Sequence, residues 1–247
     1  MYLYGHRGAK DEAPENTLAG FQHLRNLGIH CVELDVHLNH DNVPVVIHDK
    51  KLSRTTNAKG LIKGLSTADL IDVDARGHWK HHWSEPQRIP TLDEVLSAWP
   101  QLQSVQLEVK TENPEEFPIM ARALIDLCNK HQLLQRGIIT SKYPAFLQYL
   151  KASHCPQPKG FVALRTDRQL IQKALDLECH YLCLKQSVCT PELFNNAHKA
   201  GLKICVWTVN RLKQHDKFKR WGADSIITDV PSYFLNALKT NKNSIQE

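Results

Sequence analysis

The feature that most constrains the fold of this 247-residue chain is a regular alternation of strand-like and helical stretches over most of its length. Short runs rich in Val, Ile and Leu alternate with amphipathic segments from residue 104 to residue 238. We predict strands at residues 104–110, 137–141, 160–164, 181–184, 203–209 and 224–228, with a helix after each. This pattern is typical of a parallel sheet whose faces are covered by helices.

The first hundred residues supply three further strands, which we predict at residues 3–6, 31–38 and 43–48. Asn16 or Thr17 caps a predicted helix between the first two of them, and Thr91 caps a predicted helix at residues 92–99. The turn at residues 39–42 is too short for a crossover helix, so the strand after it runs antiparallel to its neighbour. Eight strands then remain for a parallel ring, the number in a (β/α)8 TIM barrel. An open doubly wound sheet is the alternative, but no Gly-rich phosphate loop marks its first turn.

We interpret residues 1–247 as a single barrel domain, with residues 50–88 as a small insertion after the second-strand hairpin. The insertion is rich in Lys, Thr, Gly and His and contains one helical piece near residues 67–73. The net charge of +5 is mild, and the basic run at residues 213–220 is best interpreted as a solvated helix face rather than a nucleic-acid patch. A modest positive charge suits a small anionic substrate.

The location in the cell is predicted from the cysteines and from apolar runs. The chain has seven cysteines, an odd number, and several of them lie within apolar runs, as small buried side chains do. No CxxC pair is present, so we reject a zinc site. No apolar run reaches the length of a membrane span, and no signal segment opens the chain. We therefore expect a cytoplasmic protein without stable membrane insertion; whether it forms a homo-oligomer stays open.

A (β/α)8 barrel carries its active site at the C-terminal ends of its strands. The polar or aromatic residues predicted there are His6, Arg7, Glu33, Asp35, Glu108, Lys110, Ser141, Lys185, Trp207, Asn210 and Asp229. His48 ends the hairpin, which returns towards the same end of the barrel.

Three of these residues are carboxylates on neighbouring predicted strands. Because side chains alternate along a strand, Glu33 and Asp35 point the same way, about 7 Å apart. Taken alone, the pair favours the polar face of a half-exposed strand. In the barrel, Glu108 joins them, and three converging acids suit a hard divalent cation, Mg²⁺ or Ca²⁺. The alternative is a buried ion-pair network of Lys110 with Glu108 and Arg7 with Glu33.

His6 and His48 are the two histidines at predicted strand ends, and as a pair beside a metal they fit a general acid and a general base. Arg7 and Lys110 offer fixed positive charge for a phosphate, or charge balance for the carboxylates. Trp207 is more typical of a rim or core aromatic, although at this position it can pack against the carbon skeleton of a substrate. Glu15 lies close to the first strand end and is a candidate to orient Arg7.

The same residues carry a resemblance to a known family. The motifs occur in the order His6-Arg-Gly8, Pro14-Glu-Asn-Thr17, Glu33-Leu-Asp-Val36, His48-Asp49, Arg54-Thr-Thr56, Ile89-Pro-Thr-Leu92, Glu108-Val-Lys110, Val206-Trp-Thr-Val-Asn210 and Thr228-Asp-Val-Pro231. In this order and over nearly the whole chain, they resemble the glycerophosphodiester phosphodiesterase family, whose fold is a (β/α)8 barrel with an insertion after the His-Asp motif.

The resemblance implies an enzyme that hydrolyses glycerophosphodiesters to sn-glycerol 3-phosphate and an alcohol. It implies that Glu33, Asp35 and Glu108 bind one divalent cation, that His6 and His48 are the acid–base pair, and that Arg7 and Lys110 hold the phosphate. Two departures fall where the leaving alcohol would lie. Ser141 is followed by Lys142 instead of the family's usual Phe, and the insertion reads Asp74-Ala-Arg-Gly77 where Asp-Ala-Gly is common.

Two other functions remain as alternatives. A phospholipid-directed phosphodiesterase of a related TIM-barrel family would need an exposed apolar or aromatic lid, whereas the insertion carries several basic residues and only Trp79 and Trp83. A non-catalytic binder of glycerol phosphate would be favoured by the loss of a histidine or a carboxylate, and the sequence retains them all.

Overall fold

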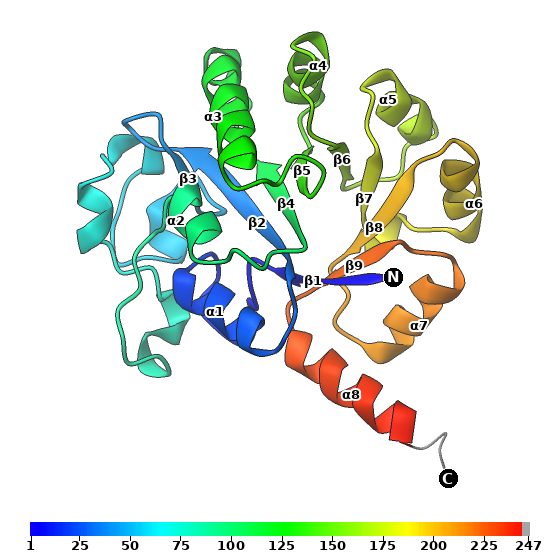
Figure 1. Cartoon of the computed structure of the whole chain (residues 1–247), viewed down its shortest axis with the longest axis horizontal. Helices are drawn as coiled ribbons and strands as arrows, with labels where there is room; N and C mark the ends of the chain where they lie inside the picture. The colour runs from blue at the N-terminus through cyan, green and yellow to red at the C-terminus, as the bar shows by residue number, and fades with distance from the viewer. Residues whose placement is uncertain (244–247) are drawn as a thin grey trace.

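In the computed structural model, which describes residues 1–243, eight parallel strands close into a barrel with helices around it (Figure 1). The hydrogen-bonded order is β1-β9-β8-β7-β6-β5-β4-β2, and β1 also pairs with β2, which closes the ring. A ninth strand, β3, pairs with β2 in the antiparallel direction. The predicted (β/α)8 barrel with its antiparallel hairpin is therefore confirmed.

The strands are β1 (Tyr2–His6), β2 (Cys31–Leu38), β3 (Pro44–Val46), β4 (Ser104–Val109), β5 (Gly137–Ser141), β6 (Lys159–Ala163), β7 (Tyr181–Lys185), β8 (Lys203–Trp207) and β9 (Ser225–Thr228). The α-helices are α1 (Leu18–Asn26), α2 (Leu92–Ser97), α3 (Phe117–Lys130), α4 (Pro144–Ala152), α5 (Leu170–Asp176), α6 (Pro191–Lys199), α7 (Leu212–Arg220) and α8 (Pro231–Asn243). Each β-strand of the barrel except β2 is followed along the chain by a helix that packs outside the ring (Figure 1).

Strand β2 is buried along its whole length, so the half-exposed strand considered from the isolated pair of acids is wrong. Its apolar residues Val32, Leu34 and Val36 belong to the large core between barrel and helices. Glu33 and Asp35 alternate with them and therefore face the interior of the barrel, at only 4% and 0% exposure. The tertiary ring, and not the strand itself, removes both carboxylates from water.

Helix N-termini follow the predicted capping residues. The Thr17 side chain accepts a hydrogen bond from the Gly20 amide at the start of α1. Thr91 caps α2 through a reciprocal capping box with Glu94. These caps satisfy amide groups that the first helical turn leaves without partners, and they fix where each loop returns to the barrel.

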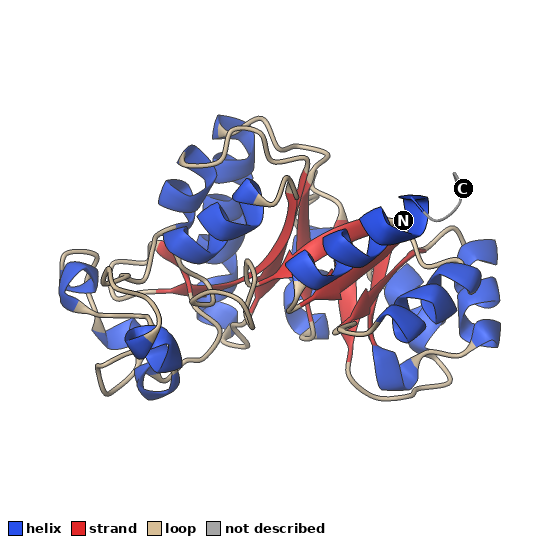
Figure 2. Cartoon of the chain, turned by 90° about the horizontal axis from the view of Figure 1, so that it is seen from below, coloured by secondary structure: helices blue, strands red, loops and turns tan. Residues whose placement is uncertain are grey.

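Residues 50–88 form a loop-rich excursion on one side of the barrel (Figure 2). It contains four 3₁₀ helices, at Leu52–Arg54, Ile62–Gly64, Asp69–Asp72 and Gly77–His81. The helical piece predicted near residues 67–73 is thus a short 3₁₀ turn. The excursion has an apolar cluster of its own, which includes Leu52, Ile62 and Leu70 and continues to Val45 of β3. The second hairpin strand is therefore held from both sides.

All seven cysteines are free and buried, as predicted from their apolar surroundings. Among the described residues, no helix is long and apolar enough to cross a bilayer.

Candidate active site at the barrel mouth

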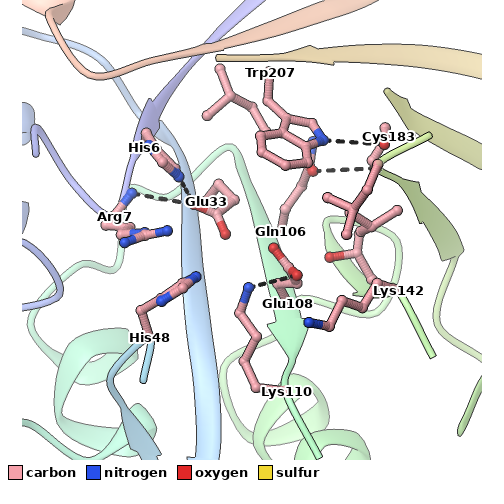
Figure 3. A pocket seen from close by; sticks show the side chains of 14 residues that line it. His6, Arg7, Glu33, His48, Gln106, Glu108, Lys110, Lys142, Cys183 and Trp207 are labelled. Carbon is pink, nitrogen blue, oxygen red and sulfur yellow. Dashed lines mark hydrogen bonds and ion pairs between the residues drawn. The ribbon is translucent and has the colours of Figure 1, made fainter. Parts of the chain in front are cut away.

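A cavity of about 110 Å³ lies at the C-terminal ends of the barrel strands (Figure 3). It is lined by His6, Arg7, Glu33, His48, Gln106, Glu108, Lys110, Thr140, Lys142, Val162, Leu164, Cys183, Trp207 and Ile227. Its charged residues come from β1, β2, β4 and the segments that follow β1, β3, β4 and β5. The apolar residues form the opposite wall. The barrel thus collects acids, histidines and cations from distant parts of the sequence into one space.

The three predicted acids meet beside this cavity. Asp35 of β2 and Glu108 of β4 are direct neighbours in the parallel register, and Glu33 lies two residues earlier on the same face of β2. One oxygen from each of the three carboxylates lies within 4.8 Å of the others. These hard oxygen donors on two rigid strands suit a hard cation such as Mg²⁺ or Ca²⁺.

The protonation of the cluster reflects its crowding. Burial, together with the neighbouring Asp35 and Glu108, raises the pKa of Glu33 well above its ordinary value. The Oε1 atom of Glu33 is buried and has no hydrogen-bond partner among the described residues. Burial would also raise the pKa of Asp35, but Lys110 and Arg7 outweigh it and hold that pKa well below the usual range. A cation at the cluster would satisfy the free Glu33 oxygen and relieve the repulsion, so the residues fit a bound metal ion.

Two buried cations flank the acids. The Nζ atom of Lys110 lies 2.6 Å from Glu108 Oε1 and 2.9 Å from Asp35 Oδ1. The Nε atom of Arg7 lies 3.0 Å from Asp35 Oδ2. The Lys110–Glu108 pair agrees with the ion-pair network considered above. Arg7, however, pairs with Asp35 and Glu15, while its backbone amide donates to Glu33.

Arg7 is held by a network outside the cavity. Its Nη1 donates to Glu15 Oε1 at 2.9 Å, as the position of Glu15 near the first strand end suggested. Arg54 of the first 3₁₀ helix donates to both Glu15 oxygens, at 2.9 and 2.8 Å. Burial would raise the pKa of Glu15, but Arg54 and Arg7 outweigh it and lower that pKa. Glu15 therefore stays ionised and fixes the guanidinium that faces the site.

His6 is paired with a carboxylate through its Nδ1 atom. This atom lies 2.5 Å from Asp229 Oδ1, and both side chains are largely buried. Asn210 donates from Nδ2 to Asp229 Oδ2 at 2.7 Å and accepts the Asp229 amide at 2.9 Å. The other ring nitrogen of His6, Nε2, lies 3.8 Å from Glu33 Oε2 (Figure 3). Asp229 and Asn210 thus orient the imidazole so that Nε2 faces the acids.

His48 has the same arrangement at the opposite side of the acids. Its Nδ1 lies 2.6 Å from Asp49 Oδ1, and the second Asp49 oxygen accepts from Arg54 Nε. Burial lowers the pKa of His48, with Asp35 opposing the shift and Arg7 and Lys110 adding to it. Arg54 therefore supports both Arg7, through Glu15, and His48, through Asp49.

Trp207 stands at the apolar wall of the cavity (Figure 3). Its Nε1 donates to the Cys183 carbonyl of β7 at 3.2 Å, which fixes the indole plane. The ring packs with the interior residues Val162, Cys183 and Ile227. Trp207 is half-buried and lines the cavity, so it occupies the rim rather than the core position of the two that its sequence position left open.

Comparisons with known proteins show the family of this chain. The model of the glycerophosphoryl diester phosphodiesterase family matches residues 6–233. The chain belongs to this family. A glycerophosphodiester phosphodiesterase of Caldanaerobacter subterraneus subsp. tengcongensis is 32% identical over 96% of this chain and 97% of its own length. One of Bacillus altitudinis is 30% identical over 93% and 94%. The structure of an Oleispira antarctica phosphodiesterase in complex with the product sn-glycerol-3-phosphate is 29% identical, with a TM-score of 0.88 over 97% of both chains.

For this member of the glycerophosphoryl diester phosphodiesterase family, the barrel brings all eight predicted site residues to one place. Apart from Glu15, the residues that support the site have no role predicted from the sequence. The sequence marks Asp229 and Asn210 as strand-end residues within family motifs and Asp49 as part of a motif, but it indicates no partner for any of them. Asn16, interpreted as part of a loop and cap, donates to Asp35 Oδ2 at 2.9 Å. Their motifs were visible in the sequence, but their partners lie far away along the chain.

Proposed function

We propose that this protein hydrolyses glycerophosphodiesters to sn-glycerol 3-phosphate and an alcohol. The observation that carries the proposal is the joint placement of three acids, two cations and two histidine–carboxylate pairs around one cavity. In the overall reaction, a phosphorus–oxygen bond to the alcohol breaks, water supplies the hydroxyl that phosphorus gains, and its proton goes to the alcohol. Each of these residues has a part in that exchange.

Glu33, Asp35 and Glu108 would hold one divalent cation, Mg²⁺ or Ca²⁺. When bound, this cation supplies Lewis-acid stabilisation of phosphoryl oxygens and lowers the pKa of a hydroxyl beside it. The side chains of Lys110 and Arg7 form ion pairs with Asp35 and Glu108, with N···O distances of 2.6 to 3.0 Å. With the carboxylate charge shared with a cation, both are free to donate hydrogen bonds to a phosphate.

His6 and His48 would move the protons. In each, Nδ1 faces a carboxylate and Nε2 is left to the cavity. One imidazole takes the proton of the attacking hydroxyl, and the other protonates the leaving alkoxide. Asp229 and Asp49 keep the Nδ1 proton in place, so that Nε2 can exchange its own. Trp207 would pack against the carbon atoms of the glycerol.

Two attacking groups fit this arrangement, the neighbouring glycerol hydroxyl, through a cyclic phosphate, and water. A substrate in which that hydroxyl is replaced by hydrogen separates them. Full turnover of this deoxy substrate excludes the cyclic route, and loss of turnover with retained binding excludes direct attack by water.

The proposal is tested with glycerophosphocholine, by measuring release of sn-glycerol 3-phosphate. We expect turnover that a chelator abolishes and that Mg²⁺ or Ca²⁺ restores. His6→Ala and His48→Ala should each lower kcat by about 10²–10⁴-fold. His81→Ala, which removes an exposed histidine of the insertion, is the matched control and should leave kcat unchanged.

Two results would contradict the proposal. If neither glycerophosphocholine nor any other glycerophosphodiester is turned over, the protein is a non-catalytic binder of glycerol phosphate. If only intact phospholipids in vesicles are cleaved, it is a phospholipid-directed phosphodiesterase.

A further inference from the structure

A basic hollow opens from the proposed active site towards the hairpin. It has a volume of about 460 Å³ and shares His48, Lys110 and Lys142 with the central cavity. Its lining contains five basic residues, Lys50, Lys51, Arg54, Lys110 and Lys142, and one acid, Asp49. The two spaces therefore share part of their walls, and basic residues outnumber acids in the lining of the outer one.

Not all of these cations are neutralised. Lys50 pairs with Glu112 at 3.0 Å, Arg54 with Glu15 at 2.8 Å, and Lys110 with the central acids. Among the described residues, no carboxylate forms an ion pair with Lys51 or Lys142. The Lys142 ammonium lies 4.9 Å from the centroid of the Tyr143 ring, with no counter-ion beside it. The hollow thus has two cations available to an anionic ligand.

Lys142 differs from the other cations of the basic hollow because it also borders a third space. A second hollow, of about 580 Å³, opens past Leu164 and Arg165, and Lys142 borders all three spaces. Figure 3 shows Lys142 on the side of the pocket opposite His6 and Arg7. The second hollow also contains two cations that form no ion pair among the described residues, Lys142 and Arg165, and its Asp167 is paired with Lys173, so charge alone does not separate the two hollows. They differ in their neighbours, because the hollow beside Lys51 is also lined by His48 and Lys110, which are proposed to act on the phosphate, whereas the second hollow is lined by neither.

The position of the second ester arm follows from the cavity walls. In the proposed function, the glycerol carbons lie against the apolar residues Val162, Leu164 and Trp207, and the scissile phosphate lies beside Arg7 and Lys110, all of which line the cavity. In this placement, a leaving alcohol on the Lys110 side of the phosphate lies towards Lys142 and the basic hollow, which share that wall with the cavity. A cationic alcohol such as choline would meet like charge there, whereas an anionic alcohol would meet two unpaired ammonium groups.

We propose that Lys142 and Lys51 select glycerophosphodiesters whose leaving alcohol carries a second anionic group, such as a further phosphate. This inference rests on the proposed function and names the substrate class of the same site. Hydrolysis of such a substrate breaks one phosphorus–oxygen bond, adds the elements of one water, and releases sn-glycerol 3-phosphate and a phosphorylated alcohol. Lys142 and Lys51 bind the second phosphate and take no part in the proton transfers.

The test compares initial kcat/KM values for three substrates at low ionic strength. These are bis(glycerophospho)glycerol, with an anionic leaving alcohol, glycerophosphoglycerol, with a neutral one, and glycerophosphocholine, with a cationic one. We expect the anionic substrate to be preferred over the cationic one by about 10-fold or more, through KM, as for one charge-assisted contact at a partly hydrated site. Raising the salt to about 0.5 M should shrink the preference because exposed charges are screened.

Substitutions of single lysines show which side chains cause the preference for an anionic leaving alcohol. Lys142→Gln should lower the ratio of anionic to cationic kcat/KM about tenfold and Lys142→Glu should lower it further, with glycerophosphocholine gaining in each. Lys51→Gln should act in the same direction. The matched control is Lys199→Gln, at an exposed lysine of α6 outside all three spaces, which should leave the ratio unchanged.

The outcomes separate this inference from the function on which it rests. Turnover of all three substrates without a charge preference, or with equal losses for all of them in Lys142→Gln, overturns the inference and leaves the hydrolase standing. A change of ratio in Arg165→Gln but not in Lys51→Gln places the anion in the other hollow and overturns the assignment. Turnover of none of the three overturns both.

Discussion

The pairing of His6 with Asp229 allows a sharp test of the proposed proton transfers, through the substitution Asp229→Asn. One oxygen of Asp229 faces Nδ1 of His6 at 2.5 Å, and the other accepts from Asn210 Nδ2 at 2.7 Å. An asparagine at this position must turn its carbonyl towards the Asn210 donor. Its amide nitrogen then donates to His6 Nδ1, which forces the single proton of the neutral ring onto Nε2.

This tautomer is wrong for either catalytic role. A base needs the Nε2 lone pair, which the proton now occupies. An acid needs the doubly protonated ring, which cannot form while Nδ1 accepts a hydrogen bond. We therefore expect Asp229→Asn to lose most of the acid–base contribution of His6, about 10²–10⁴-fold in kcat, or about 3–5 kcal/mol in activation free energy. KM should change little, because His6 is not assigned to phosphate binding.

A second substitution should reverse the effect. In the double variant Asp229→Asn with Asn210→Asp, the new carboxylate at position 210 accepts from the amide nitrogen at position 229. The carbonyl at position 229 then faces His6 and accepts its Nδ1 proton, so the correct tautomer returns. We expect kcat to recover at least tenfold relative to Asp229→Asn alone.

Steady-state assays with glycerophosphocholine, on proteins checked for folding by thermal denaturation, measure both effects. The reasoning is refuted if Asp229→Asn retains more than about a third of wild-type kcat, or if the double variant is no faster than the single one.

Three further predictions concern the surrounding charges. Burial and the acidic neighbours of Glu33 raise its pKa, so its charge destabilises the metal-free protein. At pH 8 in a chelator, Glu33→Gln should therefore raise Tm by about 2–4 °C for each kcal/mol of relieved repulsion. The same substitution should abolish the rise in Tm that Mg²⁺ or Ca²⁺ gives the wild type. Glu15→Gln should raise KM about tenfold with a small change in kcat, because Glu15 orients Arg7, whereas Glu115→Gln on the surface should change neither. Burial lowers the pKa of His37 in the folded protein, so as the pH falls the unfolded chain binds a proton at His37 before the folded one does. The free energy of unfolding therefore falls as the pH drops below about 6.5. His37→Gln should make urea midpoints less dependent on pH between 7.5 and 5, and an unchanged dependence would contradict this assignment.

The sequence was most informative where one local pattern was sufficient. The limits of β2 and β5 match the predicted ranges 31–38 and 137–141, because apolar residues recur along β2 in strict alternation and Ile138, Ile139 and Thr140 form the centre of β5. The caps Thr17 and Thr91 were visible because a side-chain oxygen three residues before a backbone amide is a local arrangement.

Predicted boundaries failed where tertiary contacts decide them. The strand predicted at 43–48 is only Pro44–Val46, because pairing with β2 covers just three of its residues. The helix predicted after the strand at 104–110 begins as a 3₁₀ turn at Pro114–Glu116 and becomes a regular α-helix at Phe117. The strand predicted to reach residue 209 ends at Trp207, whose indole is anchored to the neighbouring strand.

The sequence by itself determined the barrel, the family motifs and the eight residues proposed to act, because each lies within a short pattern of alternation or spacing. Only the tertiary structure decided which groups meet. It pairs His6 with Asp229 across 223 positions, buries Glu33 and Asp35 together, and lets Lys142 border three spaces at once. The physical reason is that charge, burial and hydrogen bonding act over a few ångströms in space, and closing the ring brings together residues that the sequence keeps far apart.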